Sequence, residues 1–189
     1  MLLYSHDILI ALGANAPLNG QQPEVTLNQA IERLSKTKVE VVSLSRFYRT
    51  PAFPLRSGPD FVNAAARLRY DKTPVQLLEL LHAVEAEFGR ERVIRWGQRT
   101  LDLDLIATGD SVLPNREVYE SWRALPPAQQ LQQTPDEIIL PHPRMQERAF
   151  VLVPLCDIAP DWCHPVLKRS IREMLLELPE AERAAIRPI

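Results

Sequence analysis

Residues 61–70 read FVNAAARLRY, and the alternation within this stretch decides the fold. Successive side chains of a strand point to opposite faces of its sheet. One set is apolar apart from a terminal phenol: Val62, Ala64, Ala66, Leu68 and Tyr70. The other set is mixed and partly charged: Phe61, Asn63, Ala65, Arg67 and Arg69. The pattern predicts a strand with one face against a helix-covered core and the other face open.

The next segment, TPVQLLELLHAVEAEFG at 73–89, predicts a helix with clear ends. Thr73 and Gln76 are spaced as a capping box, and Pro74 occupies the first helical position. Gly89 is a typical stop signal. The apolar side chains recur at helical spacing: Leu77, Leu78, Leu81, Val84 and Phe88.

The order of elements along the chain indicates the fold class. Residues 7–13 and 39–51 are rich in apolar and β-branched side chains and predict strands, with an amphipathic helix at 23–36 between them. A further strand is expected at 101–106. The order β-α-β-β-α-β predicts an α+β, ferredoxin-like antiparallel sheet with both helices on one face, followed by a C-terminal helix at about 168–178.

Length and composition limit the classes of protein to which this chain can belong. The chain has 189 residues, of which 46% are hydrophobic, so we expect one domain over 1–189 with an inserted excursion at about 111–137. The net charge of −2 disfavours a nucleic-acid or anionic-membrane binder. No window reaches the ~18 apolar residues of a membrane span. A cytoplasmic monomer is expected.

Two carboxylates lie on the strand within WGQRTLDLDLIATG, residues 96–109. Asp102 and Asp104 should share the open face, while Leu101, Leu103 and Leu105 face the core. Carboxylates ~6.6 Å apart along a strand repel by about 2 kcal/mol at an effective dielectric of ~20. A bound Mg²⁺ would remove this cost. Alternatively, the pair is a solvated polar face.

Arginines crowd the neighbouring loops. The first loop carries Arg90, Arg92, Arg95 and Arg99, and a second carries His142, Arg144 and Arg148. Guanidinium groups donate paired hydrogen bonds to phosphate oxygens, so together with the aspartates they predict a nucleoside triphosphate site. Ion pairs with nearby glutamates could instead account for some of them. No G-x-x-x-x-G-K-[ST] run is present, so a P-loop kinase is disfavoured.

Phe61 and Asn63 share the expected open face. A ring beside a carboxamide can stack on a flat heterocycle and bind its edge. The alternatives are that Phe61 and Phe150 pack in the core and that Asn63 caps the end of a strand.

Four segments, FYRTP, DFVNAA, RWGQRTLDLDLI and PHPRMQERAFVLVPLCDIAP, resemble in order and spacing the motifs of the 6-hydroxymethyl-7,8-dihydropterin pyrophosphokinase family. The resemblance runs from about Ile8 to Pro160. It implies a ferredoxin-like enzyme of folate biosynthesis that transfers pyrophosphate from ATP to 6-hydroxymethyl-7,8-dihydropterin and releases AMP, using two Mg²⁺ ions.

The resemblance also implies roles for individual residues. Metal binding would fall to Asp102 and Asp104, and catalysis to Arg90 and Arg99. The implied ATP contacts are Glu85, Arg92, Trp96, His142 and Arg148. The implied pterin contacts are Thr50, Pro51, Phe61, Asn63 and Phe150. The competing hypothesis is a non-catalytic ferredoxin-like module that binds a nucleotide or metal for regulation.

Overall fold

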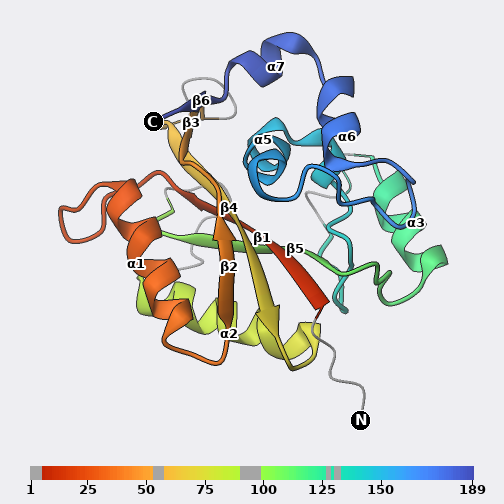
Figure 1. The fold of residues 1–189 in the computed structure, drawn as a ribbon, viewed down its shortest axis with the longest axis horizontal. Helices are drawn as coiled ribbons and strands as arrows, with labels where there is room; N and C mark the ends of the chain where they lie inside the picture. The colour runs from red at the N-terminus through yellow and green to blue at the C-terminus, as the bar shows by residue number, and fades with distance from the viewer. Residues whose placement is uncertain (1–5, 53–57, 90–98, 127–128, 130–132) are drawn as a thin grey trace.

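A six-stranded antiparallel sheet runs through the middle of the molecule, with helices on either side (Figure 1). The structure is a computed structural model that describes residues 6–52, 58–89, 99–126, 129 and 133–189. The strands are β1 (His6–Ala14), β2 (Glu40–Leu44), β3 (Tyr48–Thr50), β4 (Phe61–Tyr70), β5 (Asp102–Thr108) and β6 (Arg187–Pro188). Their order is β5-β1-β4-β3-β6, and β2 also pairs with β4.

One face of the sheet packs on α1 (Pro23–Ser35) and α2 (Pro74–Glu87). The predicted apolar set of β4 lies in this core, as do Leu101, Leu103 and Leu105. The predicted capping box of α2 is present: the Thr73 hydroxyl accepts from the Gln76 N–H, and the Gln76 side chain accepts from the Thr73 N–H. The helix ends at Glu87 and Gly89 follows with φ +71°. These sequence predictions are confirmed.

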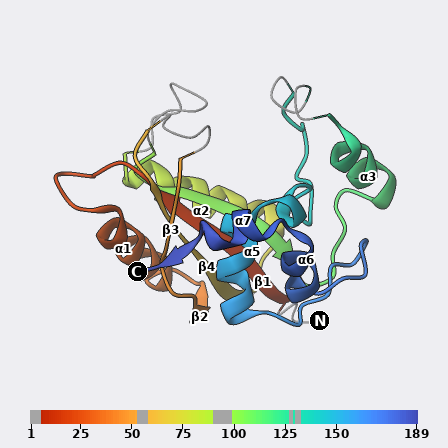
Figure 2. The ribbon, with the colours of Figure 1, turned by 90° about the horizontal axis from the view of Figure 1, so that it is seen from above.

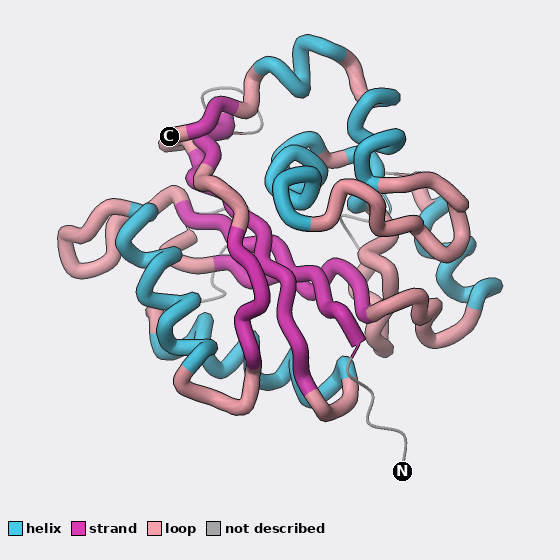
Figure 3. The backbone as a smooth tube through the Cα atoms, viewed as in Figure 1, coloured by secondary structure: helices cyan, strands magenta, loops and turns pink. Residues whose placement is uncertain are grey.

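The opposite face is not wholly open. Helix α5 (Ala149–Ile158) lies over its middle and is backed by α6 (Ile171–Glu177). Figure 3 shows the strands between the two groups of helices. Val151, Leu152 and Leu155 of α5 form a second core with Ala65 of β4 and Leu9 of β1. The ferredoxin-like class is confirmed, and both helices of its core, α1 and α2, lie on one face as expected. The expectation that the other face is open is wrong, because α5 covers part of it.

The predicted single strand at 39–51 is broken into β2 and β3. At the break, the Ser45 N–H donates to the Ala65 carbonyl, and the Ser45 hydroxyl accepts from the Ala65 N–H, both at 2.9 Å. A side chain thus replaces a backbone acceptor in the ladder. Both halves still pair with β4.

After β5 the chain runs to the side of the molecule opposite α1 (Figure 2). Within the expected excursion, α3 (Arg116–Ala124) begins after the N-cap Asn115, whose side chain accepts from the Val118 N–H. The 3₁₀ turn η1 (Met145–Glu147) precedes α5. The short helix α7 (Glu180–Ala184) leads to β6.

Helix α6 begins three residues later than predicted. Lys168 has φ +56°, which no helix accommodates, and Ser170 forms a capping box with Glu173. These two features place the start at Ile171. Within the described ranges, no helix has the length and apolar character that crossing a membrane requires.

Candidate active site

Asp102 and Asp104 project from β5 on the face opposite the first core. Both are half-buried, while Leu101, Leu103 and Leu105 are almost wholly buried on the other side, as predicted. Across the sheet, Asp102 pairs with Gly13 of β1 and Asp104 with Ala11. Directly beside the two carboxylates, β1 therefore carries only small residues on this face.

Asn63 lies on the next strand, in the same row as Asp102 and Gly13. Gly13 pairs with both, so the row runs Asp102, Gly13, Asn63 across three strands. The Asn63 side chain is buried at 6% exposure, and its Nδ2 donates to Thr50 Oγ1 at 2.7 Å. A Cβ on Gly13 would come within 2.8 Å of Asn63 Oδ1. Glycine is required here because the carboxamide lies directly over the backbone.

Arg99 lies beside the aspartates. Its guanidinium forms an ion pair with Asp102. Its backbone is tied to the end of β1, since the Arg99 carbonyl accepts from the N–H groups of Asn15 and Ala16 at 2.9 and 3.1 Å. The Asn15 side chain in turn accepts from the Arg99 N–H at 2.8 Å. Three hydrogen bonds thus fix the start of the aspartate-bearing segment.

His142 approaches the same carboxylates from the second loop. Its N–H donates to the Ile106 carbonyl of β5 at 2.7 Å, and its Nδ1 accepts from the Arg144 N–H at 3.1 Å. Burial, together with the positive charge of Arg148, lowers the pKa of His142 to about 3. The imidazole is therefore neutral at physiological pH and is a poor base. Its Nε2 lies 3.5 Å from Nη1 of Arg148, a group that can only donate.

Arg148 completes the cationic side of this site. Burial lowers the pKa of its guanidinium, and the charges of Asp104 and Asp102 oppose that shift. Positive charge from Arg144 and Arg99 adds to the lowering. The structure thus brings Arg99, His142 and Arg148 together around the two aspartates, as the sequence predicted.

The two phenylalanines that the resemblance assigns to the pterin are both at least partly accessible. Phe150, in the first turn of α5, is 40% exposed, which excludes the alternative of core packing for its side chain. The Arg148 guanidinium carbon lies 5.8 Å from its ring centroid. Phe61 is half-buried at the start of β4, and it pairs with Thr50. Thr50 is buried and Pro51 is exposed.

Glu85 lies in the core beneath β5. The residue is 2% exposed, and its Oε1 accepts from the Leu103 N–H at 2.7 Å. The structure therefore places it against the backbone between the two aspartates. The remaining predicted site residues, Arg90, Arg92 and Trp96, lie outside the described residues.

Sequence reasoning missed Gly13 and Asn15. Both belong to GANAP, residues 13–17, at the end of the first predicted strand. The signal that could have found them is the glycine itself, since a glycine within a strand often marks a close approach of another group to the backbone.

Two surface hollows of about 810 and 310 Å³ lie near Asp7, at the opposite end of β1, and none of the site residues lines them.

The two aspartates can hold a hard cation only when a bound ligand supplies further oxygen atoms. Within the described ranges, no group of three or more His, Cys, Asp or Glu side chains is arranged to hold a metal ion. Two carboxylates are nevertheless the usual protein share of a Mg²⁺ site that is completed by water and substrate phosphates. Asp102 and Asp104 fit that role.

Comparison with known proteins gives a consistent result. A sequence profile of the family 7,8-dihydro-6-hydroxymethylpterin-pyrophosphokinase (HPPK) matches residues 9–160. A 2-amino-4-hydroxy-6-hydroxymethyldihydropteridine pyrophosphokinase from Synechocystis is 37% identical over 186 residues, which cover 97% of this chain and 80% of the relative. The protein of the same name from Pseudomonas aeruginosa is 37% identical over 172 residues, 91% of each chain.

Among solved structures, wild-type HPPK-DHPS of Plasmodium falciparum is similar, with a TM-score of 0.64 and 14% identity. The match covers 92% of this chain but only 44% of the Plasmodium chain, so this chain spans less than half the length of that protein. At this level of identity the likeness concerns the fold alone.

Proposed function

Because the chain belongs to the 7,8-dihydro-6-hydroxymethylpterin-pyrophosphokinase family, we propose that its active site is the uncovered part of the second sheet face. The protein is a pyrophosphokinase of folate biosynthesis, an ATP-dependent diphosphotransferase that transfers pyrophosphate to the hydroxymethylpterin. AMP is the other product. In the proposed arrangement, the ATP phosphates lie over β5 and the pterin lies over β3 and β4.

The row Asp102, Gly13, Asn63 is the observation that carries this arrangement. Neighbouring strands are ~4.8 Å apart, so the backbones of Asp102 and Asn63 are separated by about 10 Å across the glycine. That span suits a pterin edge at one end and a phosphate group at the other, joined by a hydroxymethyl carbon. The glycine leaves room for the Asn63 carboxamide, which lies over its backbone.

Asp102 and Asp104 would hold the two Mg²⁺ ions. When bound, Mg²⁺ would neutralise phosphate charge and polarise the reacting oxygens. Arg99 would contribute to catalysis, a role that the ion pair of its guanidinium with Asp102 supports. It would donate to phosphate oxygens whose negative charge increases as the bond to AMP breaks.

His142 and Arg148 would bind the triphosphate from the other side. The imidazole of His142 is neutral, and Arg148 offers a guanidinium that burial leaves poorly hydrated. Roles for Arg90 in catalysis and for Arg92 and Trp96 in ATP binding stay predictions. For Glu85, the buried position supports an indirect role in ATP binding, through the backbone of β5.

Pterin binding would use residues of three elements. Asn63 would bind the polar edge of the ring, with Thr50 holding the carboxamide in place. Phe61 and Phe150 would contact the ring faces, and the chain at Thr50 and Pro51 would supply backbone groups. With the ring fixed in this way, the hydroxymethyl oxygen would attack the β-phosphorus of ATP in line.

The competing hypothesis of a non-catalytic regulatory module has no support in the family match. Phosphorus NMR of the protein with Mg-ATP and 6-hydroxymethyl-7,8-dihydropterin tests the two directly. We expect AMP and a pterin diphosphate. ADP would indicate ordinary phosphoryl transfer, and unchanged ATP would favour the non-catalytic module. We further propose a single-domain, cytoplasmic monomer, which sedimentation and cell fractionation would test.

A further inference from the structure

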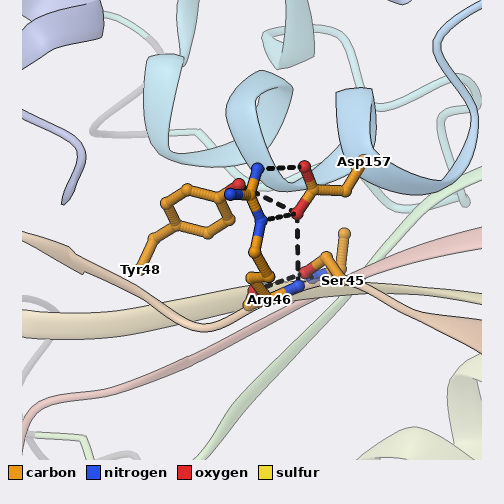
Figure 4. Close-up of polar contacts among 5 residues, drawn as sticks. Ser45, Arg46, Tyr48 and Asp157 are labelled. Atoms are coloured by element: carbon orange, nitrogen blue, oxygen red, sulfur yellow. Dashed lines mark hydrogen bonds and ion pairs between the residues drawn. The ribbon is translucent and has the colours of Figure 1, made fainter. Parts of the chain in front are cut away.

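Asp157 joins α5 to the strands on the edge of the proposed pterin site (Figure 4). Its two carboxylate oxygens accept from the Arg46 guanidinium, with Nη2–Oδ1 at 2.7 Å and Nε–Oδ2 at 3.1 Å. Oδ2 also accepts from the Tyr48 hydroxyl at 2.8 Å and from the Arg46 N–H at 3.2 Å. One side chain of the helix therefore makes four hydrogen bonds with the residues that join and begin β3.

The position of Asp157 in the helix is unfavourable without these partners. It is the penultimate residue of α5, where the helix dipole is negative and disfavours a carboxylate. Burial would raise the pKa of this carboxyl, but the hydrogen bonds from Arg46 and Tyr48 outweigh burial and lower it. The Tyr48 phenol is itself buried, and burial, followed by the bond to Asp157, raises its pKa to about 12. Asp157 is thus held ionised and Tyr48 protonated.

Both sides of this cluster connect directly with predicted pterin contacts. On α5, Phe150 precedes Asp157 by seven residues, which is two turns, so the two side chains project from the same side of the helix about 10 Å apart. On the sheet, Tyr48 is the register partner of Asn63, and Thr50 follows two residues later on the same face. The apolar contacts of the second core hold α5 on the sheet, and the bonds of Asp157 add direction-dependent polar contacts near its C-terminal end.

We propose that Asp157, with Tyr48 and Arg46, is a positioning cluster that sets the rotation of α5 and hence the placement of Phe150 relative to Asn63. The inference rests on the proposed function, since it assumes that Phe150 and Asn63 bind the pterin. None of the three cluster residues is assigned to touch a substrate. Loss of the cluster should therefore weaken pterin binding and leave ATP binding unchanged.

Two variants test the cluster: Asp157→Asn, which keeps the shape and removes the charge, and Tyr48→Phe, which keeps the ring and removes one donor. We expect each to raise the Kd for the pterin about tenfold, since small misplacements of binding groups have effects of this order. The Kd for Mg-ATP should stay within about twofold. The double variant should resemble the more severe single one, because residues that act as a unit are not additive.

Glu87→Gln is the matched control. Glu87 forms a similar two-pronged pair with Arg33, at 2.6 and 2.7 Å, but this pair joins α1 and α2 on the opposite face. Its removal should leave both dissociation constants unchanged. Pterin binding is measured by fluorescence with a non-hydrolysable ATP analogue present, and the melting temperature of each variant is recorded beside it.

Turnover by the wild-type protein is measured first, because its absence would overturn the proposed function itself. With an active wild type, unchanged pterin affinity in both single variants overturns the positioning role alone. So does an equal loss of affinity for pterin and ATP, which would indicate general destabilisation. If Asp157→Asn does not fold, the test depends on Tyr48→Phe alone, and the same comparison of pterin and ATP affinity applies.

Discussion

The carboxylate of Glu85 accepts a hydrogen bond from the backbone N–H of Leu103 at 2.7 Å, and Leu103 is the residue between the two aspartates. A helix of the first core thereby fixes the strand at the point from which both carboxylates project. The placement of Asp102 and Asp104 therefore depends on Glu85, which belongs to a helix on the opposite face of the sheet.

Glu85→Ala should lower the free energy of unfolding by about 1.5–3 kcal/mol, because it leaves the buried Leu103 N–H unsatisfied. It should also weaken Mg-ATP binding. Glu85→Gln retains a carbonyl acceptor and should have the smaller effect on both. Urea denaturation and ATP titration measure the two quantities. Glu79→Ala, at an exposed position of the same helix, is the control, and equal behaviour of Glu85→Ala and this control would contradict the prediction.

Asp102→Asn or Asp104→Asn should reduce turnover by at least about a hundredfold with the fold retained. Each change removes a charge that would hold Mg²⁺, without changing the size of the side chain. Steady-state AMP release and circular dichroism measure activity and fold. Asp110→Asn, beyond the other end of β5, should retain full activity. Normal turnover of either site variant at saturating Mg²⁺ would disprove the metal assignment.

Gly13→Ala should weaken the binding of the pterin more than the binding of ATP. The added methyl group would lie 2.8 Å from Asn63 Oδ1, so the carboxamide must move and its bond to Thr50 is strained or lost. We expect the KM for the pterin to rise about tenfold or more. Gly58→Ala adds the same methyl group with only one neighbour, at 4.0 Å, and should behave as wild type. Unchanged pterin KM in Gly13→Ala would show that Asn63 is not a pterin contact.

His164 should make stability depend on pH. It is fully buried, its Nδ1 accepts from the N–H groups of Val166 and Leu167, and its Nε2 lies 2.9 Å from the Tyr119 hydroxyl. Burial, and then the charge of Arg123, lowers its pKa to about 4. The unfolded chain takes up this proton near pH 6.5, so stability is present above that pH and falls as the pH drops toward 4.

The loss attributable to His164 should total about 3 kcal/mol across that window. Urea denaturation at pH 7.5, 5.5 and 4.5 measures it, with His164→Gln as the non-titrating comparison. The variant should be less stable than wild type at pH 7.5 but should show the shallower pH dependence. An imidazole NMR signal of His164 that titrates near pH 6.5 would refute the assignment.

Local patterns predicted the first half of the fold well. Alternation in 61–70 and the capping box at Thr73 each depend on near neighbours in the chain, and both were correct. The break between β2 and β3 could not be predicted, because it depends on Ser45 reaching Ala65 of another strand. Helix α5 was missed because AFVLVPLCDI is apolar at most positions, so no period stands out, and Pro154 argues against a helix.

The grouping of charged residues in the candidate site could be predicted from the sequence. The aspartates, Arg99, His142 and Arg148 could be chosen from their types and spacing, and the structure brings them together. Glu85 was chosen by resemblance alone, and its contact with the backbone of Leu103 could not be foreseen from its type. The cluster around Asp157 joins residues 109 and 111 positions apart, and only tertiary structure reveals such a contact.

The C-terminal strand β6 has a consequence for how the molecule behaves at high concentration. It pairs with β3, opposite Tyr48 and Arg49, and so occupies the edge that β3 would otherwise present to a strand of another molecule. Its own second residue is Pro188, which has no N–H to offer an incoming strand. Growth of the sheet from one copy to the next is therefore discouraged at this edge, and the protein gains resistance to aggregation through β-pairing.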